Sequence, residues 1–224
     1  MTRDEKLARH RHLREIGVGL QSGALRRVAG NTMLDYGRRL GLARGRTPVC
    51  NSSSEMSLIC DLAVYAGKAG RSTGMERYAR SVGPTLTGDE AMMLRAAQAT
   101  HFRLWRIERP HEIVGLWVVD IILGDTLWLI DEGLEATGQA GIVFAGRLKA
   151  VEDFVMTCGV VIPISLTLLA AAMGSMPKVA AASRADALDD PRFALLIYRS
   201  AVETGAMESV HFGELDELAL ESAD

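Results

Sequence analysis

The sequence predicts an α+β protein in which a helical N-terminal half packs on a small, barrel-like sheet of five antiparallel strands, with further helices at the C-terminus. Residues 102–164 are rich in Val, Ile, Trp and Phe, and clusters of Gly, Pro or Asp interrupt them at the spacing of short strands. Between residues 50 and 100, three Ser or Thr residues each precede a Glu by three positions, a pattern that begins helices. We therefore expect a helical region over 1–100, a β domain over 101–164 and a helical region with an acidic tail over 165–224.

The first two helices follow from apolar residues that recur at helical spacing. One is expected over residues 4–28 and a second over 32–40, ending at Gly41. Glycines between positions 17 and 23 weaken the first helix, since each costs about 0.5 to 1 kcal/mol relative to alanine in a helix interior. A bend or break is therefore expected there.

Three further helices are expected after a loop over residues 41–53. Their caps pair a Ser or Thr with a Glu, each side chain satisfying a free backbone N–H group: Ser52 with Glu55, Thr73 with Glu76, and Thr87 with Glu90. The first of these helices is apolar enough to be buried, and Asp61 is its polar exception. The other two should span residues 74–81 and 88 to about 100.

Turn signals divide the β region into strands. The Gly124-Asp125 pair stands where a two-residue hairpin needs a positive φ angle, so strands over 116–123 and 126–131 should pair antiparallel. The chain continues through a strand over 142–149 into a last one over 154–164. Closing five such strands into a small barrel would remove exposed strand edges.

Two of these strands are apolar on both faces. In residues 116–123 and 154–162, both alternating sets of side chains are mostly hydrophobic, whereas a strand with one face in water would alternate with polar residues. Burying either set is favourable by roughly 1.5 to 3 kcal/mol per large side chain. The outside of the sheet must therefore be covered, either by the neighbouring helices or by a second copy of the protein.

The C-terminal region should be helical with an acidic end. A short buried helix is expected over 166–173, and an alanine-rich surface helix or link over 178–187. The sequence Asp189-Asp190-Pro191 is typical of a helix start, and that helix should run to about Thr204. The last residues should form a tail.

The two ends of the chain carry opposite charge. Residues 1–50 hold eleven Lys and Arg against four acidic residues, whereas residues 181–224 hold three Arg against ten acidic residues. The alternative functional interpretation is a nucleic-acid-binding protein whose basic N-terminal helices contact phosphates through Arg9, Arg11, Arg14, Arg26 and Arg27. The simpler interpretation is that these are solvated helix faces, or that the two ends lie close together.

Charged residues inside the apolar strands are the best candidates for a polar site. A charge held there must be paired or reach the surface, and the residues concerned are Asp120, Asp131 and Arg147. A buried Asp/Arg salt bridge is the favoured interpretation, and a ligand-binding cluster at the barrel mouth is the alternative. The three tryptophans of the β region are expected in the core, with a base-stacking platform as the alternative: Trp105, Trp117 and Trp128.

The segment over residues 67–74, GKAGRSTG, invites comparison with phosphate-binding loops. A P-loop needs its Lys directly before the Ser or Thr and a strand before the loop, and neither condition is met. We interpret it as a loop between helices. The alternative is that backbone N–H groups at the helix start near Thr73 hold an anion.

Composition bounds the remaining classes. Three cysteines without metal-like or redox spacing indicate free thiols in a reducing compartment, and Cys158 is expected to be an inert core thiol. No cofactor and no metal site is expected, because His10 and His12, two residues apart, diverge on a helix and the other histidines are isolated from further ligands. The N-terminus is charged throughout and the longest apolar window is shorter than the roughly 20 residues of a spanning helix, so a cytoplasmic protein without membrane contact is expected.

The order of motifs resembles a bacterial family of uncharacterised proteins. The resemblance covers residues 30–165 and rests on the segments SSSEMSLICDLAVY, GRSTGMERYARS, TGDEAMMLRAAQATHFRLWRIE, DIILGDTLWLIDEG and FVMTCGVVIPI. It implies a helical half followed by a compact β half. It implies no activity and no functional residue.

These observations favour a non-enzymatic binding or regulatory protein that acts through protein–protein contacts and self-associates. Its expected partners are another protein or further copies of the chain, with nucleic acid as the alternative. An enzymatic reading would require one pocket that joins Asp120, Asp131 and Arg147.

Overall fold

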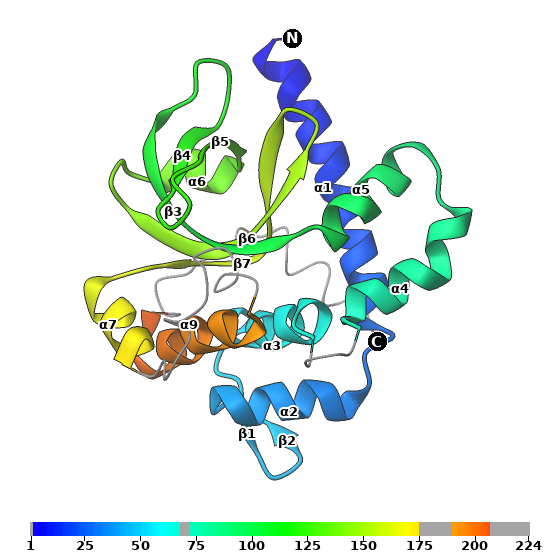
Figure 1. Ribbon diagram of the computed structural model, residues 1–224, viewed down its shortest axis with the longest axis vertical. Coiled ribbons are helices and arrows are strands. Elements are labelled where there is room, and N and C mark those ends of the chain that lie inside the picture. The colour runs from blue at the N-terminus through cyan, green and yellow to red at the C-terminus, as the bar shows by residue number, and fades with distance from the viewer. Residues whose placement is uncertain (1, 68–71, 175–189, 207–224) are drawn as a thin grey trace.

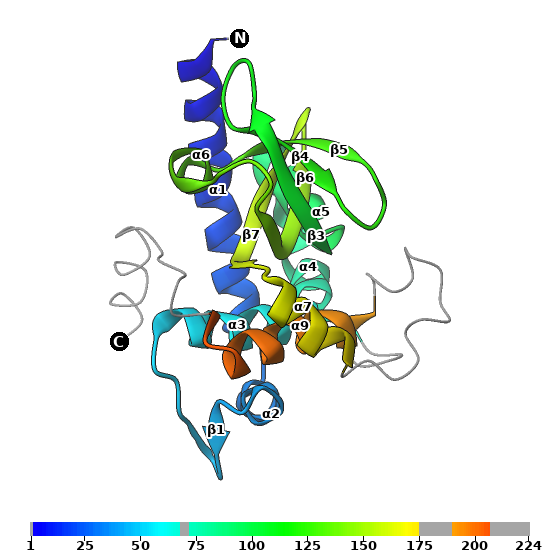
Figure 2. The same ribbon diagram turned by 90° about the vertical axis from the view of Figure 1, so that its left-hand side faces the viewer.

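The computed structural model describes residues 2–67, 72–174 and 190–206, and it confirms the α+β class. A five-stranded, barrel-like sheet occupies one end of the molecule, and helices pack against part of its outside (Figures 1 and 2). The strands of the sheet are β3 (His101–Pro110), β4 (Leu116–Asp120), β5 (Thr126–Ile130), β6 (Val143–Val151) and β7 (Phe154–Pro163).

The strands pair in the cyclic order β3-β4-β5-β7-β6, with β6 also pairing with β3. Four of the contacts are antiparallel. The contact between β5 and β7 is parallel and short, with only Leu129 opposite Val155 and Ile130 opposite Met156. The expectation of a purely antiparallel sheet is therefore wrong. The β6–β7 hairpin folds back so that β6 lies against β3, which leaves β7 beside β5 and running in the same direction.

A short helix that the sequence analysis did not identify, α6 (Glu132–Thr137), connects β5 to β6. Asp131 begins it by accepting a hydrogen bond from the backbone N–H of Leu134 at 3.0 Å. Five strands in this cyclic order, a parallel contact between the third and fifth, and a helix between the third and fourth are the connectivity of the OB-fold, a partly open Greek-key barrel.

The β4–β5 hairpin differs from the predicted two-residue turn. Val119 lies opposite Thr126, so the connection has the five residues 121–125 and β4 ends at Asp120. Gly124 does adopt a positive φ of 86°, as predicted. The longer loop forms because the Asp120 carboxylate accepts hydrogen bonds from the backbone N–H groups of Ile122 and Leu123.

Three hydrophobic clusters account for the apolar character of the strands on both faces. The barrel interior is filled by one face of each strand, including Trp105, Leu116 and Leu129. Outside the barrel, one cluster joins it to α2 (Gly30–Leu40), α3 (Ser53–Tyr65) and α9 (Pro191–Glu203), and another joins it to α1 (Arg3–Leu25), α4 (Gly74–Val82) and α5 (Gly88–Gln98). Helices of the same chain therefore cover the outer faces of β3, β6 and β7 (Figure 1), whereas Trp117 and Val119 on the outer face of β4 are partly exposed. A second copy of the chain is not needed to bury β7.

The bounds of the helices agree with the sequence patterns in most places. The N-terminal ones are α1 (Arg3–Leu25), α2 (Gly30–Leu40), α3 (Ser53–Tyr65), α4 (Gly74–Val82) and α5 (Gly88–Gln98). Ser52 and Thr73 accept the predicted cap hydrogen bonds, and Gly41 ends α2 with a φ of 80°. Thr87 makes no side-chain cap hydrogen bond, so the third predicted cap is wrong. The loop after α2 carries a small hairpin of β1 (Ala43–Arg44) and β2 (Thr47–Pro48).

The described C-terminal elements are α7 (Leu166–Gly174) and α9 (Pro191–Glu203). Asp190 caps α9 and Pro191 occupies its first turn, as the sequence predicts. Helix α7 is less buried than predicted: Leu166 is 87% exposed, while Leu168 is fully buried. The predicted helix or link over 178–187 and the acidic tail after 206 lie outside the described residues.

Helix α1 continues through its glycines without the expected break. The reason is close packing: a Cβ atom at Gly23 would lie 2.5 Å from the Tyr78 hydroxyl, and one at Gly17 would lie 2.5 Å from Nζ of Lys149. Two of the glycines therefore allow neighbouring side chains to approach the helix axis. At Gly19 a Cβ would meet nothing within 4 Å.

This contrast predicts opposite effects of two alanine substitutions on the same helix. Gly19→Ala should raise the free energy of unfolding by about 0.5 to 1 kcal/mol, since it improves helix propensity at an open position. Gly23→Ala should lower it by roughly 1 to 3 kcal/mol, because the new methyl group displaces the Tyr78 ring. Urea unfolding of both variants measures the two changes, and equal stabilisation would contradict the packing role of Gly23.

Candidate functional site

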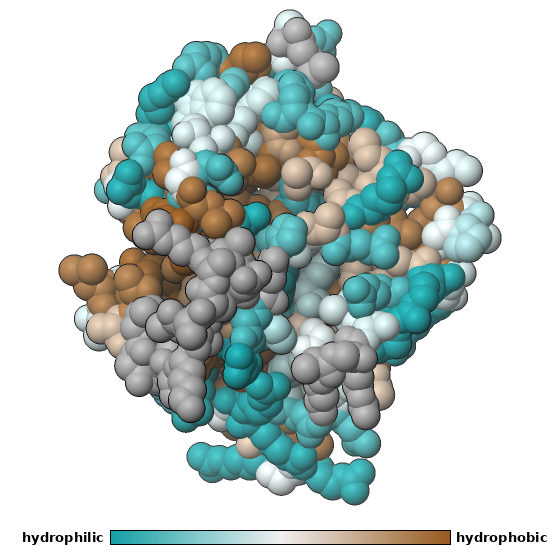
Figure 3. Space-filling model, viewed as in Figure 1, coloured by the Kyte–Doolittle hydropathy of each residue, from teal (hydrophilic) through white to brown (hydrophobic). Residues whose placement is uncertain are grey.

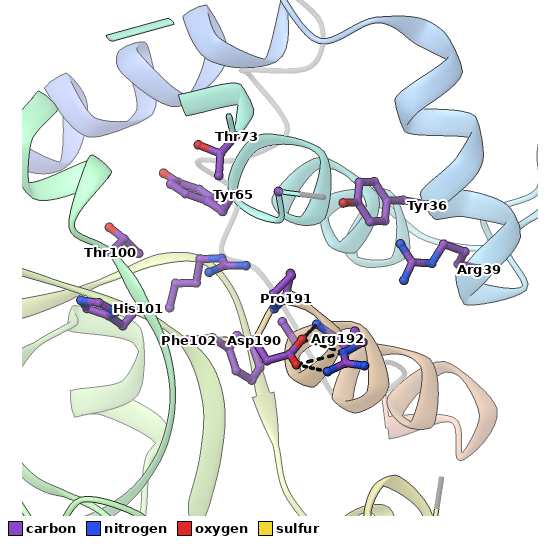
Figure 4. A pocket seen from close by; sticks show the side chains of 13 residues that line it. Tyr36, Arg39, Tyr65, Thr73, Thr100, His101, Phe102, Asp190, Pro191 and Arg192 are labelled. Carbon is purple, nitrogen blue, oxygen red and sulfur yellow. Dashed lines mark hydrogen bonds and ion pairs between the residues drawn. The ribbon is translucent and has the colours of Figure 1, made fainter. Parts of the chain in front are cut away.

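A pocket of about 820 Å³ lies where the layer of α2, α3 and α9 meets the barrel. The volume is in the range that small-molecule sites use. Figure 4 shows side chains from α2, α3, β3 and the start of α9 surrounding a common space. Because these segments are far apart in the sequence, the pocket exists only once the helical layer has docked on the barrel.

Arg147 of β6, which lines the pocket, forms a buried ion pair with Asp61 of α3 behind it. The Arg147 Nε atom lies 2.9 and 3.0 Å from the two carboxylate oxygens, and the side chains are 7% and 0% exposed. Tyr198 of α9 donates its hydroxyl hydrogen to the same carboxylate at 3.0 Å. Burial raises the pKa of Asp61, although the bonds from Arg147 and Tyr198 oppose that shift.

Local backbone geometry makes room for this pair. The pairing of β6 with β7 shifts register between Gly146 and Arg147, so the β7 strand carries extra residues there. Such bulges bend a strand and re-aim its side chains. Gly159 lies in the bulge with a φ of 82°, and a Cβ atom on it would be 3.2 Å from the Asp61 carboxylate. A glycine at this position therefore allows Asp61 to reach Arg147.

The rest of the Arg147 guanidinium lies between aromatic rings. Its central carbon is 5.0 Å from the ring centre of Tyr65 and 5.8 Å from that of Phe102. Asp61 occupies only the Nε edge, and no described residue accepts a hydrogen bond from the two terminal nitrogens. Arg147 lines the pocket and is the least exposed of the three arginines in its described wall.

Further polar groups stand around the pocket. Arg39 lies over the ring of Tyr36, whose hydroxyl donates to the carbonyl of Ala66. Arg192 is held by the Asp190 carboxylate in the first turn of α9 (Figure 4). Together with Arg147, these side chains give the described wall more cationic than anionic groups.

Thr73, at the N-terminus of α4, also lines the pocket. The sequence analysis named its N–H groups as an alternative anion site. In the structure, the Thr73 N–H donates to Glu76 and the Glu76 N–H donates to Thr73, so the capping box uses both.

The three charged residues predicted to form a polar cluster do not come together. Arg147 pairs with Asp61 instead of with either predicted aspartate. Asp120 pairs with Arg103 at 3.3 Å, while Asp131 caps α6 and accepts a hydrogen bond from Thr157 at 2.6 Å. The expected Asp/Arg salt bridge is therefore present with a different aspartate. The signal for it was Asp61, a charged residue among the apolar residues in the middle of α3.

The arginines proposed for nucleic-acid contacts have different environments. Arg9 pairs with Asp89 and Glu152, and Arg11 pairs with Glu132. Arg14 and Arg26 are exposed, as is Arg27, whose guanidinium lies over the Tyr78 ring. Acidic residues of α5, α6 and the β6–β7 turn therefore pair with the positive charge at the start of α1, while the acidic tail after residue 206 lies outside the described residues. Nucleic-acid binding stays a prediction.

The tryptophans are divided between the interior and the outside of the barrel. Trp105 is fully buried in the interior, as expected. Trp117 and Trp128 are opposite one another on the outer face of β4 and β5, and the His111 ring stacks on Trp128 at 4.0 Å. Lys6 of α1 lies 5.0 Å from the Trp128 ring centre. OB-folds bind oligonucleotides on this face, but here α1 and the His111 loop already contact it.

His10 is buried where α1 packs on the barrel. It is 2% exposed, and neither ring nitrogen has a hydrogen-bond partner. Burial lowers its pKa from the ordinary value of 6.5, and the neighbouring Arg14 and Lys149 lower it further, while Asp131 and Glu132 act in the opposite direction. His10 is therefore held neutral at the α1–barrel contact.

Other site chemistry is limited within the described residues. Cys158 is buried, and its Sγ atom lies 3.0 Å from the Tyr65 hydroxyl. Over residues 2–67, 72–174 and 190–206, His, Cys, Asp and Glu side chains form no group of three that could hold a metal ion. No helix in this part of the chain combines the length and the apolarity needed to cross a bilayer.

The profile of a family of unknown function (DUF7986) matches residues 4–197, which include the barrel and both helical layers. No curated protein and no solved structure matches the chain.

The buried His10 predicts that acid weakens folding. Its pKa in the folded protein lies below the unfolded value of 6.5, so between these two values the unfolded chain binds more protons. The free energy of unfolding should therefore fall as the pH drops below 6.5, and His10→Leu should reduce that fall. Urea unfolding at pH 7.5 and 5.5 compares the two proteins. Burial also lowers the pKa of His111, but this effect is the same in the wild-type protein and in His10→Leu and cancels in the comparison.

Proposed function

The chain belongs to the DUF7986 family, whose function is unknown, and from the site itself we propose a non-enzymatic binding protein that takes a small molecule in the pocket between barrel and helices. The observation that carries this proposal is the buried Arg147, whose terminal donors line the pocket without a protein acceptor among the described residues.

The position of the pocket supports a regulatory role. Its wall joins α2 and α9 to β3 and β6, so a bound molecule would contact the helical layer and the barrel at once. Any ligand that binds only the folded chain stabilises it by mass action. A bound ligand would therefore stabilise the packing of the helical layer on the barrel. Through that change in stability, the ligand concentration could regulate the protein.

The polar groups of the pocket favour binding over catalysis. Asp61 accepts hydrogen bonds from Arg147 and Tyr198, and the Tyr65 hydroxyl is hydrogen-bonded to the Cys158 thiol. These groups serve to pair charges and to orient rings. A catalytic reading would need a nucleophile within reach of a base.

A pocket-filling variant tests this function. We expect a panel of small metabolites, screened by thermal unfolding, to contain compounds that stabilise the wild-type protein. At ten times its Kd a compound should stabilise by about 1.4 kcal/mol, a rise of about 3 to 6 °C in Tm. Thr100→Trp places an indole in the pocket and should abolish the rise. The control Thr126→Trp, on the exposed end of β5, should not. Equal responses of both variants would contradict the proposal.

Self-association is a second candidate function. Leu166 at the start of α7 is 87% exposed and Ile121 in the β4–β5 loop is 39% exposed. Figure 3 shows hydrophobic surface around α7, on the side of the molecule where that helix meets the barrel. Exposed apolar surface of this kind favours contact with another protein surface, here a second copy of the chain.

Light scattering after size-exclusion chromatography tests this candidate. We expect the wild-type protein to elute with twice the mass of a single chain and Leu166→Glu to elute as a monomer, because a buried carboxylate opposes the contact. Val49→Glu introduces the same charge at an exposed apolar residue after β2 and should leave the mass unchanged. A monomeric wild-type protein would remove self-association.

A further inference from the structure

Resting on the proposed function, we propose that the ligand carries an oxyanion, a phosphate or carboxylate group, bound by the terminal nitrogens of Arg147. Arg147 has terminal N–H donors from which no residue in the described part of the chain accepts a hydrogen bond.

A guanidinium has five N–H donors, and Nε carries only one of them. Asp61 accepts from Nε through both of its oxygens, which leaves the four donors on the two terminal nitrogens. The side chain is 7% exposed, and no described residue accepts from these four. Among the described side chains, the fully buried nitrogens without a hydrogen-bond partner belong to His10 and Trp105, so the terminal nitrogens of Arg147 reach the surface of the pocket, where a ligand can accept from them. The open side of Arg147 is the pocket.

The shape of the vacant donor edge points to an oxyanion. Two parallel N–H groups match two oxygens of a carboxylate or phosphate, and such charge-assisted bonds are about twice as strong as neutral ones. A neutral carbonyl would satisfy at most part of this edge. The Arg147 fork therefore discriminates by charge as well as by geometry.

The remaining charges favour the same class of ligand. Asp61 already balances the charge of Arg147, and Asp190 balances Arg192 at the start of α9. Arg39 adds a further cation, exposed at the wall of the pocket. An anionic group bound to Arg147 therefore has Arg39 available to offset its charge.

The aromatic wall indicates what the oxyanion is attached to. Tyr36, Tyr65 and Phe102 all line the pocket, and its volume of about 820 Å³ far exceeds that of an inorganic ion. Flat apolar groups pack well against such rings. The expected ligand is an organic phosphate or carboxylate with an unsaturated or aromatic body.

Titration calorimetry at constant ionic strength tests the inference with phenyl phosphate, benzoate and the neutral analogue phenol. At least one anion should bind about tenfold or more tightly than phenol. Arg147→Lys, which keeps a charge for Asp61 but loses the fork, should lower that affinity about tenfold. Arg39→Gln, on an exposed residue, should lower it less and guards against a folding defect in the first variant. Arg199→Gln, an exposed arginine of α9 paired with Glu203, is the matched control and should bind as the wild type does.

The arms separate the outcomes. A preference for phenyl phosphate over benzoate, or the reverse, identifies which oxyanion the site takes, and both support the inference. Phenol binding as tightly as the anions, or a folded Arg147→Lys variant that retains full affinity, would overturn it. If neutral compounds stabilise the wild-type protein but not Thr100→Trp, the pocket function stands and only the oxyanion is wrong. If no compound of any charge binds, both fail.

Discussion

The ion pair between Asp61 and Arg147 is the contact on which the joint between helices and barrel depends. It links α3 to β6, and Tyr198 brings α9 to the same carboxylate. Removing one partner of such a pair leaves an uncompensated buried charge, at a cost of about 3 to 5 kcal/mol. Hydrophobic burial around it supplies the attraction between the layers, while the pair fixes how they are aligned. The pocket inherits its geometry from that alignment.

Local sequence signals were sufficient for most of the fold. Capping residues such as Ser52, Thr73 and Asp190 begin helices through bonds within four residues, so their effect is visible in the sequence. The two-sided apolar character of 154–162 correctly indicated that the sheet would be covered. The parallel contact of β5 with β7 was not predictable in this way, because two pairs of residues from distant strands leave no local pattern. The predicted break in α1 was wrong for the same reason. The side chains that pack against its glycines, Tyr78 and Lys149, belong to other elements and leave no local pattern.

In the candidate site, too, local signals identified the residues but not the contacts between distant segments. A charge in an apolar strand marked Arg147, and a polar residue on a buried helix face marked Asp61, but nothing in the sequence joined them across 86 residues. The actual partners of Asp120 and Asp131 are a neighbouring strand arginine and a helix N-terminus, each satisfying the charge locally. Sequence reasoning can therefore say that a buried charge needs a partner. It names the partner only when both belong to one element.

Helix α1 precedes in the chain the barrel on which it packs, so it is translated before its partners. Its ion pairs reach residues far along the chain, with Lys6 and Asp153 separated by 147 positions. At roughly 5 to 20 residues per second, about 7 to 30 s pass between the emergence of these two residues from the ribosome. Throughout that interval Leu13 and Leu20 have no barrel to cover them. Arg9 and Arg11 of the same helix likewise precede the acidic residues that pair with them, so their charges face water until those residues are translated.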